Sequence, residues 1–341
     1  MTNYRFMGRS GVRVSPLTLG AMMFGAWGNP DHDDSIRIIH RALDAGINVI
    51  DTADVYSAGE SEEIVGKALA DGRRDDVILA TKLHGRMGDA PNRGGNSRRW
   101  IMRSVEDSLR RLRTDWIDLY QIHRWDPETD LDDTLGALTD LVTAGKVRMI
   151  GSSTFPVRKV VEAQWVSERR GRERFLTEQP PYSILVRRIE AELLPAAQEL
   201  GLGVIPWSPL AGGWLTGGYR LGAETPRSTR ANLVPARFDM STPGNQRKLE
   251  IVDALGGLAD EAGMTLIQMA IAFVIRHPAI TSAIIGPRTM EQLESQLGAD
   301  EVVLDDALLD RIDELVPPGT TVNLADDGWA NPALEPEARR R

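Results

Sequence analysis

Four residues from three segments of the chain have types and positions suited to acid–base chemistry at a carbonyl oxygen. They are Asp51, Tyr56, Lys82 and His123. A buried Lys82 needs a counter-charge, which Asp51 can supply from an adjacent strand. A lysine ammonium beside the Tyr56 phenol stabilises the phenolate, so the phenol becomes a usable acid–base group. His123 can donate a hydrogen bond to the same substrate oxygen as that oxygen becomes an alkoxide.

Each of these residues alone also has an ordinary structural interpretation. An aspartate at a strand end is most often a helix cap or a turn residue, a lysine is usually solvated, and a histidine on an apolar strand is usually structural. Polar residues, however, end nearly every predicted strand. They are Asp51, Asp54, Lys82, His123, Ser152, Ser153, Gln179, Trp207 and Ser208. Their convergence at one end of a sheet favours a functional site.

The elements that would position these residues form a repeated strand–helix alternation. The predicted strands are 17–20, 48–53, 77–82, 117–123, 147–153, 175–179, 203–208 and 281–286. Their residues are mostly apolar, with little alternation between apolar and polar side chains, which is typical of parallel strands buried on both faces. Eight such strands can close into a (β/α)8 TIM barrel, which we favour over an open doubly wound sheet. In a barrel the active site lies at the carboxyl ends of the strands.

Three segments of the single predicted domain, residues 1–341, lie outside this repeat. Residues 1–16 predict a short N-terminal hairpin. Residues 210–245 predict a long loop after strand 7, and loops of that length are usually functional or disordered. Residues 316–341 predict an extended C-terminal tail, whose Trp329 is expected either over the barrel mouth or on the barrel's side.

The composition excludes several classes of protein. The chain has no cysteine, so no disulfide framework and no cysteine metal site can exist, and no metal is expected. A net charge of −9 argues against a nucleic-acid partner. No apolar run reaches about 18 residues and no apolar signal core begins the chain, so neither a membrane span nor a secretory signal is expected. We expect a cytoplasmic globular protein.

The strings around the four residues resemble the aldo-keto reductases over essentially the whole chain, and most closely their bacterial and potassium-channel-β-subunit-like branch. NVIDTADVYSAGESEEIVGKAL carries Asp51 and Tyr56, ATKLHG carries Lys82, and DWIDLYQIHRWD carries His123. The resemblance implies that these residues are the family's catalytic tetrad. It also implies reduction of an aldehyde or ketone to an alcohol by NADPH (NADP+), with Tyr56 as the general acid.

The resemblance further implies a cofactor site without a GxGxxG motif. Ser153-Thr154 stands where relatives have Ser-Asn, and Arg288 would bind the 2′-phosphate of NADPH. Relatives often carry a lysine at Gly218, which Arg220 or Arg230 could replace. The 210–245 loop is expected to cover the cofactor. The implied cofactor contacts are Gly20, Met22, Asp51, Ser153, Thr154, Gln179, Trp207, Ser208, Pro209, Leu210, Gly212, Leu215, Gly217, Arg230, Ile285, Gly286, Arg288, Gln292 and Gln296.

The resemblance implies a small carbonyl or alcohol compound as the substrate. Phe24, Trp27, His84 and Trp125 are expected to line its cleft. Two other functions stay open: an NADPH-binding redox-sensing or regulatory subunit with slow turnover, and an aldolase or isomerase that forms a Schiff base on Lys82. Relatives include monomers and larger assemblies, so a homo-oligomer is also left open.

Overall fold

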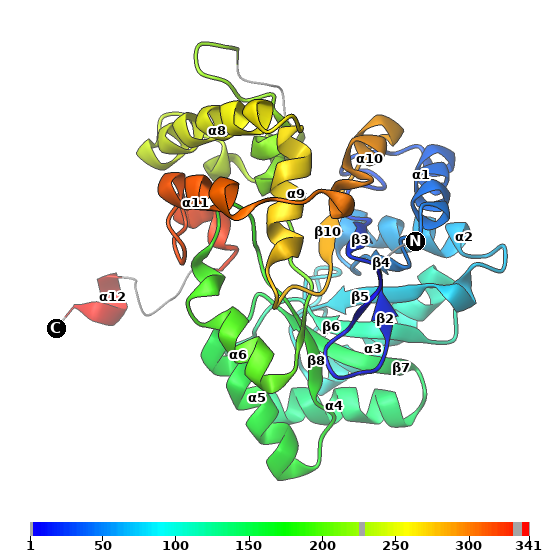
Figure 1. Ribbon diagram of the computed structural model, residues 1–341. Coiled ribbons are helices and arrows are strands. Elements are labelled where there is room, and N and C mark those ends of the chain that lie inside the picture. The colour runs from blue at the N-terminus through cyan, green and yellow to red at the C-terminus, as the bar shows by residue number, and fades with distance from the viewer. Residues whose placement is uncertain (1–2, 225–228, 330–335, 341) are drawn as a thin grey trace.

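The computed structural model describes residues 3–224, 229–329 and 336–340, and a parallel eight-stranded sheet curls through its centre (Figure 1). The strands lie side by side in the order β10, β3, β4, β5, β6, β7, β8, β9. Their bounds are β3 (Leu17–Gly20), β4 (Val49–Asp51), β5 (Ile78–Leu83), β6 (Ile117–Ile122), β7 (Val147–Ser153), β8 (Phe175–Gln179), β9 (Gly203–Val204) and β10 (Ala283–Ile285). Hydrogen bonds of 2.9 Å from Thr281 N to Val204 O and from Ile284 N to Pro206 O join the last two strands. The predicted TIM barrel is therefore confirmed.

The seventh barrel strand, β9, is shorter than its apolar run predicts. The sequence predicts a strand over 203–208, but regular pairing stops at Val204. Pro206 has no amide hydrogen to donate to a ladder. Beyond it, Trp207 pairs only through single bridges to Pro181 and to Ile284. The other predicted strands agree with the structure to within one or two residues at each end.

Helices surround the sheet and connect its strands (Figure 1). They are α1 (His32–Asp44), α2 (Glu60–Ala68), α3 (Arg98–Leu112), α4 (Leu131–Thr143), α5 (Val157–Arg170), α6 (Leu193–Leu200), α7 (Thr229–Leu233), α8 (Pro243–Glu261), α9 (Leu266–Arg276), α10 (Met290–Gln296), α11 (Asp306–Leu315) and α12 (Pro336–Arg339). A capping box formed by Thr265 and Gln268 begins α9. In the described ranges no single helix is both long and apolar enough to cross a membrane, and α8 with α9 reaches that length only across a 94° bend.

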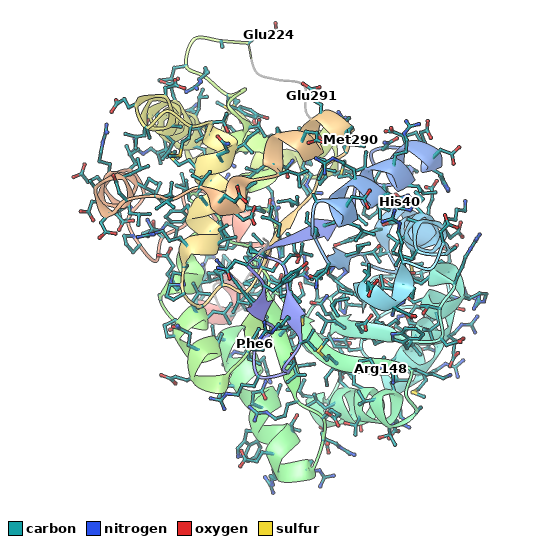
Figure 2. The ribbon with its side chains drawn as sticks, turned by 45° about the vertical axis from the view of Figure 1, so that its right-hand side comes forward. Phe6, His40, Arg148, Glu224, Met290 and Glu291 are labelled. Atoms are coloured by element: carbon teal, nitrogen blue, oxygen red, sulfur yellow. The ribbon has the colours of Figure 1, made fainter. Side chains whose placement is uncertain are left out.

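The N-terminal hairpin is present and closes the amino-terminal end of the barrel. It pairs β1 (Arg5–Phe6) with β2 (Arg13–Val14) in antiparallel register. Met7 and Val14 are completely buried with residues of the barrel interior. Gly8 has a φ of +54°, and a Cβ there would lie 2.6 Å from Gly203 N, so the turn needs glycine. Figure 2 labels the exposed ring of Phe6 on this hairpin.

The predicted loop 210–245 is not one open loop. It contains the 3₁₀ turns η4 (Ala211–Thr216) and η5 (Pro235–Arg237), the short helix α7 and the start of α8. Glu224 lies at the tip of this loop, which projects from the body of the protein in Figure 2. The remaining 3₁₀ turns are η1 (Tyr56–Gly59), η2 (Arg74–Asp76), η3 (Arg188–Glu190), η6 (Ala299–Glu301) and η7 (Leu324–Asp327).

Residues 316–329, the first part of the C-terminal tail, fold back onto the loop and α8, whereas α12 lies apart from them (Figure 1). The carboxylate of Asp326 lies 2.8 Å from Lys248 Nζ, and both side chains are buried. Arg237 Nε donates to Ala325 O at 2.9 Å. These contacts hold η7 against η5 and α8. Residues 330–335 and 341 of the predicted tail lie outside the described residues.

Candidate active site

A buried lysine forms the centre of the polar cluster at the carboxyl ends of the strands. Lys82 Nζ lies 2.5 Å from Asp51 Oδ2, 2.8 Å from Thr52 O and 3.3 Å from Tyr56 Oη. These three acceptors use all three ammonium hydrogens. Burial alone would lower the pKa of Lys82, but the charges of Asp51 and Tyr56 outweigh it and raise this pKa. Lys82 is therefore a fixed cation directly below the Tyr56 hydroxyl.

The Asp51 carboxylate is held from its other side by two amides. Its Oδ1 accepts hydrogen bonds from Gln179 Nε2 at 2.8 Å and from Gln121 Nε2 at 3.1 Å. The network thus joins β4, β5, β6 and β8 across the barrel interior. Because every charge in it is paired and hydrogen-bonded, the network is tolerated in the interior and fixes its members in place.

Tyr56 lies at the start of a strained turn. Ser57 and Ala58, with φ values of 48° and 57°, both have left-handed backbone conformations that are unfavourable for residues with a Cβ. Ser57 Oγ accepts a hydrogen bond from Trp27 N at 3.1 Å, which ties the turn to the loop after β3. The indole of Trp27 lies 6.0 Å from the Tyr56 ring. The turn leaves Tyr56 partly exposed above the buried Lys82 and Asp51.

His123 completes the group from the end of β6. Its ring packs edge-on against the Tyr56 ring at a centroid distance of 5.7 Å. Burial, the Lys82 ammonium and Arg124 hold the pKa of His123 well below its usual range. A neutral imidazole still offers one N–H donor. Tyr56 and His123 therefore present two hydrogen-bonding groups to one point at the barrel mouth, above a buried cation.

The residues expected at the nicotinamide lie together, with one difference in detail. Ser153 Oγ donates to Gln179 O at 3.0 Å, at the ends of β7 and β8. Thr154 has a left-handed φ of 56°, which is strained for a β-branched residue. Its hydroxyl accepts a hydrogen bond from Trp207 Nε1 at 3.2 Å. Thr154 is thus engaged with the neighbouring indole, a contact that the sequence did not predict.

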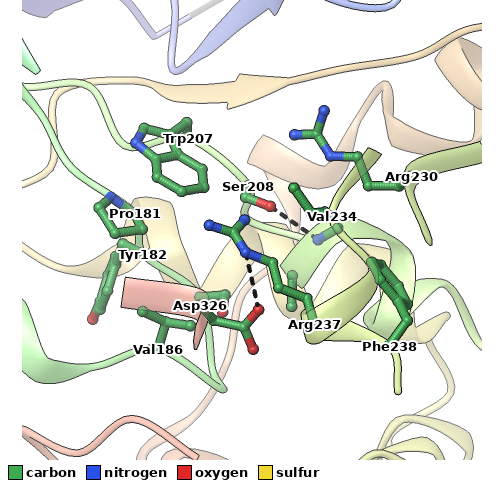
Figure 3. Close-up of a pocket in the computed structure, with 13 residues that line it drawn as sticks. Pro181, Tyr182, Val186, Trp207, Ser208, Arg230, Val234, Arg237, Phe238 and Asp326 are labelled. Atoms are coloured by element: carbon green, nitrogen blue, oxygen red, sulfur yellow. Dashed lines mark hydrogen bonds and ion pairs between the residues drawn. The ribbon is translucent and has the colours of Figure 1, made fainter. Parts of the chain in front are cut away.

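The segment after β9 and part of the 210–245 loop line a pocket, drawn in Figure 3. Ser208 Oγ accepts from Gly212 N at 2.9 Å and holds the turn into η4. Arg230 reaches across to Met22, whose Sδ lies 3.0 Å from Arg230 Nη1. Arg220 instead points to α8, where it donates to Asp253 O at 3.3 Å. Of the two arginines suggested for the missing lysine, only Arg230 lines the pocket.

The same pocket contains two residues that sequence reasoning missed. Arg237 Nε lies 3.7 Å from Asp326 Oδ1, and its guanidinium lies 5.5 Å from the centre of the Trp207 ring. Figure 3 shows Arg237 between Trp207 and Phe238, with a dashed line to Asp326 beside Val186. The two residues come from the loop and the tail, and no motif in the sequence links them. The pocket wall therefore depends on the folded-back tail.

The residues expected at the adenosine end surround the start of α10. Arg288 N donates to Gln292 Oε1 at 2.8 Å, and Gln296 Nε2 donates to Gln292 O at 2.9 Å. Asn29 Nδ2 donates to Arg288 O at 3.1 Å. Gly286 is exposed, and a Cβ there would meet nothing within 4 Å. This end is open enough for a ligand to approach its backbone.

The available acceptors fit a nicotinamide dinucleotide. Among the described residues, the buried Gln296 Oε1 has no hydrogen-bond partner, and no donor reaches Gln179 Oε1. The first suits an exocyclic adenine amine and the second suits a carboxamide amine. In the same part of the chain, no group of three or more His, Asp or Glu side chains could hold a metal ion.

The structure places the other predicted residues as follows. Gly20 pairs with Asp51 in the sheet, Pro209, Leu210, Leu215 and Gly217 lie on or beside η4, and Ile285 ends β10. The side chains of Leu215 and Ile285 are buried, so only their backbone could contact a cofactor.

The expectation for the substrate cleft is partly wrong. Phe24 is completely buried in the main core and cannot line a cleft. His84 Nδ1 pairs with Asn96 Oδ1 at 3.0 Å. The Trp125 and Trp329 rings lie 6.5 Å apart, and a Cβ on Gly328 would lie 2.7 Å from the Trp207 ring. The tail therefore folds over the mouth, which is one of the two places expected for Trp329.

Asp54 is also not at the mouth, and its position predicts a pH-dependent stability. It is buried beside Ser104 of α3, whose hydroxyl donates to its Oδ2 at 3.1 Å, and Oδ1 has no partner among the described residues. Burial and the charge of Glu62 raise its pKa from 3.8 to about 7. The folded protein thus keeps a proton that the unfolded chain releases. The stabilisation from Asp54 is complete below the unfolded pKa and is lost as the pH rises through about 7.

Because an asparagine at this position cannot ionise, we expect the Asp54→Asn variant to lose ~2–3 kcal/mol less unfolding free energy than the wild type between pH 5 and pH 8. Urea unfolding at both pH values measures this. Asp75→Asn, at an exposed position in η2, is the control and should leave the difference unchanged. An equal pH dependence in Asp54→Asn and the wild type would contradict the assignment.

Comparison with known proteins agrees with this geometry. The profile of the family described as "Aldo/keto reductase family" matches residues 16–317. The uncharacterized oxidoreductase YrpG of Bacillus subtilis is 41% identical over 326 residues, covering 92% of this chain and 96% of YrpG. A probable voltage-gated potassium channel subunit beta of Arabidopsis thaliana is 33% identical over 319 residues, covering 92% and 96%. Versiconal hemiacetal acetate reductase of Aspergillus parasiticus is 35% identical over 327 residues, covering 88% and 93%.

Proposed function

This chain belongs to the aldo/keto reductase family, whose members in general reduce carbonyl groups with NAD(P)H, and from that premise we propose that it reduces an aldehyde or ketone to an alcohol with NADPH, using Tyr56 as the general acid. The observation that carries the proposal is the hydrogen-bonded series Asp51–Lys82–Tyr56 below a neutral His123. We also propose that the protein acts in the cytoplasm on a small carbonyl compound.

Each of the four side chains has a separate role at the substrate carbonyl. Bound NADPH supplies the hydride that reaches the carbonyl carbon. Tyr56 Oη donates the proton to the carbonyl oxygen, and Lys82 stabilises the negative charge that remains on the phenol. Asp51 and Thr52 hold the ammonium so that its third hydrogen faces Tyr56. His123 donates a hydrogen bond that orients the carbonyl.

The cofactor would lie across the carboxyl ends of the last barrel strands. Ser153 and the free oxygen of Gln179 would bind the carboxamide, and the Trp207 ring would lie near the nicotinamide. The turn from Ser208 to Gly217, together with Arg230, would hold the pyrophosphate under the 210–245 loop. At the other end, Arg288 would bind the 2′-phosphate, while Gln292 and Gln296 would contact the adenine.

A regulatory role is a second candidate, because a relative at 33% identity is named a probable voltage-gated potassium channel subunit beta. Such a protein would bind NADPH and turn over slowly. The Schiff-base alternative has no such support. It needs a neutral amine, whereas Lys82 has a raised pKa and all three of its hydrogens are engaged.

Parallel assays with NADPH and NADH over a panel of aldehydes and ketones test the proposal. We expect carbonyl-dependent consumption of NADPH and a higher kcat/KM for NADPH than for NADH. Arg288→Gln should reduce that cofactor preference by at least about tenfold, because charge-assisted hydrogen bonds to the 2′-phosphate are lost. Failure to oxidise NADPH with any carbonyl, or a preference for NADH, would refute the proposal. Tight NADPH binding without turnover would instead favour the regulatory role.

A further inference from the structure

The proposed reaction leaves one guanidinium at the barrel mouth without a role. Arg124 directly follows His123 at the end of β6 and is partly exposed. Its Nη1 donates to His123 O at 2.5 Å and lies 3.5 Å from Ser153 Oγ. Its side chain therefore lies along the strand ends between the carbonyl-orienting histidine and the expected nicotinamide site. Among the described residues, no Asp or Glu forms an ion pair with Arg124.

The charges near Arg124 do not neutralise it. The buried Glu178 is engaged elsewhere: it accepts from the Ser152 hydroxyl and from Phe155 N at 3.1 Å, and burial raises its pKa to about 7. Burial lowers the pKa of Arg124, Tyr56 and Glu178 oppose that change, and Arg237 adds to it. A guanidinium nevertheless stays charged at any working pH. Arg124 is thus an unneutralised cation close to the reacting group.

The other two arginines of the mouth already have partners or assignments. Arg237 lies near Asp326 and donates to Ala325 O. Arg230 reaches Met22 and lines the pocket assigned to the pyrophosphate. The mouth therefore has an excess of positive charge, although the whole chain has a net charge of −9. A locally positive site in an acidic protein concentrates anionic ligands there.

We infer that Arg124 binds an anionic group of the substrate, so that the protein prefers carbonyl compounds carrying a carboxylate. This inference rests on the proposed reductase function. A planar guanidinium can hold a carboxylate through two parallel hydrogen bonds, which are stronger than neutral ones. Because Arg124 Nη1 reaches both His123 O and Ser153 Oγ, a carboxylate on this guanidinium would be held between the carbonyl-orienting histidine and the expected nicotinamide site.

The competing explanation is that Arg124 only braces the end of β6 through its bond to His123 O. A brace would affect every substrate equally, whereas a carboxylate site affects only charged ones. Two aldehydes that differ by one methyl group and one charge separate these explanations: 4-carboxybenzaldehyde and its uncharged methyl ester, methyl 4-formylbenzoate. 4-Oxobutanoate and its methyl ester, methyl 4-oxobutanoate, form an aliphatic pair with the same logic.

The experiment compares kcat/KM for each acid with kcat/KM for its neutral partner, using the full chain and NADPH. We expect the wild type to favour the acids, mainly through a lower KM. Arg124→Met should reduce the ratio of acid to neutral partner at least about 30-fold, the scale for a lost hydrogen bond to a charged group. Arg124→Lys should keep part of the preference. Arg158→Met, which removes a cation from the rim beside the Trp125 ring, is the matched control and should leave the ratio within about twofold.

Each result has a distinct meaning. Equal losses on acid and neutral partner in Arg124→Met would identify a brace and overturn the inference. Wild-type turnover of neutral aldehydes without a preference for the acids would also overturn it, while the proposed reductase function would stand. Absence of NADPH oxidation with all carbonyl compounds would refute the reductase function itself, and the inference would fall with it.

Discussion

Replacing Tyr56 with phenylalanine should lower kcat at least about 100-fold, the usual minimum for loss of a general acid. The variant removes only the hydroxyl that Lys82 Nζ approaches at 3.3 Å. The ring contacts with Trp27 and His123 do not need that hydroxyl, so the fold should be retained. Single-turnover rates with saturating NADPH measure the chemical step, and unfolding curves verify that the variant is folded.

A matched variant tests whether losing any buried phenol has the same effect. Tyr120 is completely buried on β6, and its hydroxyl has no hydrogen-bond partner among the described residues. Tyr120→Phe should keep kcat within about twofold, because removing an unsatisfied polar group is neutral or stabilising. Near-normal turnover in a folded Tyr56→Phe variant would remove Tyr56 from the mechanism.

Replacing Lys82 with methionine should produce a second large effect, on both rate and stability. We expect kcat to fall by about 100-fold or more, because the cation that stabilises the phenolate is lost. We also expect the unfolding free energy to fall by about 3–5 kcal/mol, since Asp51 is left as a buried charge without its cation. The two amide donors of Gln121 and Gln179 remain on Oδ1 and compensate only in part.

The double variant Asp51→Asn/Lys82→Met separates these two effects. Removing the carboxylate removes the unpaired charge, so much of the lost stability should return. The rate should stay low, because Tyr56 still has no cation beneath it. Urea unfolding and single-turnover kinetics on both variants make the comparison. Recovery of the rate together with the stability would show that Lys82 acts only by maintaining the fold.

Much of the fold was predictable because apolar runs report burial on both faces. β3, β7 and β8 have the bounds that their sequences predict. An apolar run indicates burial but not which residues pair with a neighbouring strand. The run over 203–208 therefore did not predict that β9 ends at Val204. Pro206 lies inside an apolar run, yet it cannot donate to a neighbouring strand. The short helices within the 210–245 loop were missed for a similar reason, because Gly and Pro content indicates only irregular backbone.

The clustering of Asp51, Tyr56, Lys82 and His123 was predictable because their local strings are specific. The surroundings of this cluster depend on contacts between distant segments. Nothing in the sequence distinguishes Phe24, which is buried in the core, from Trp27, which is partly exposed beside Tyr56. The Arg237–Asp326 pair joins loop and tail only after folding. The left-handed backbone of Thr154 and its bond to Trp207 likewise follow from tertiary packing. Arg124 directly follows His123, but a single arginine carries no motif that would mark it as a candidate.

Because β9 ends early, the barrel has a weakly paired seam between β9 and β10. Only sparse bridges join the two sides there, so local opening should start along this line, and the amides of Thr281 and Ile284 should exchange with solvent sooner than those inside the other strand pairs. The proposed pyrophosphate contacts follow β9, and the proposed adenosine contacts follow β10, on opposite sides of the seam. A bound dinucleotide would therefore bridge the segments that follow β9 and β10 and oppose their separation. At a concentration about 100 times its Kd it would add ~2.7 kcal/mol to the stability of the whole barrel.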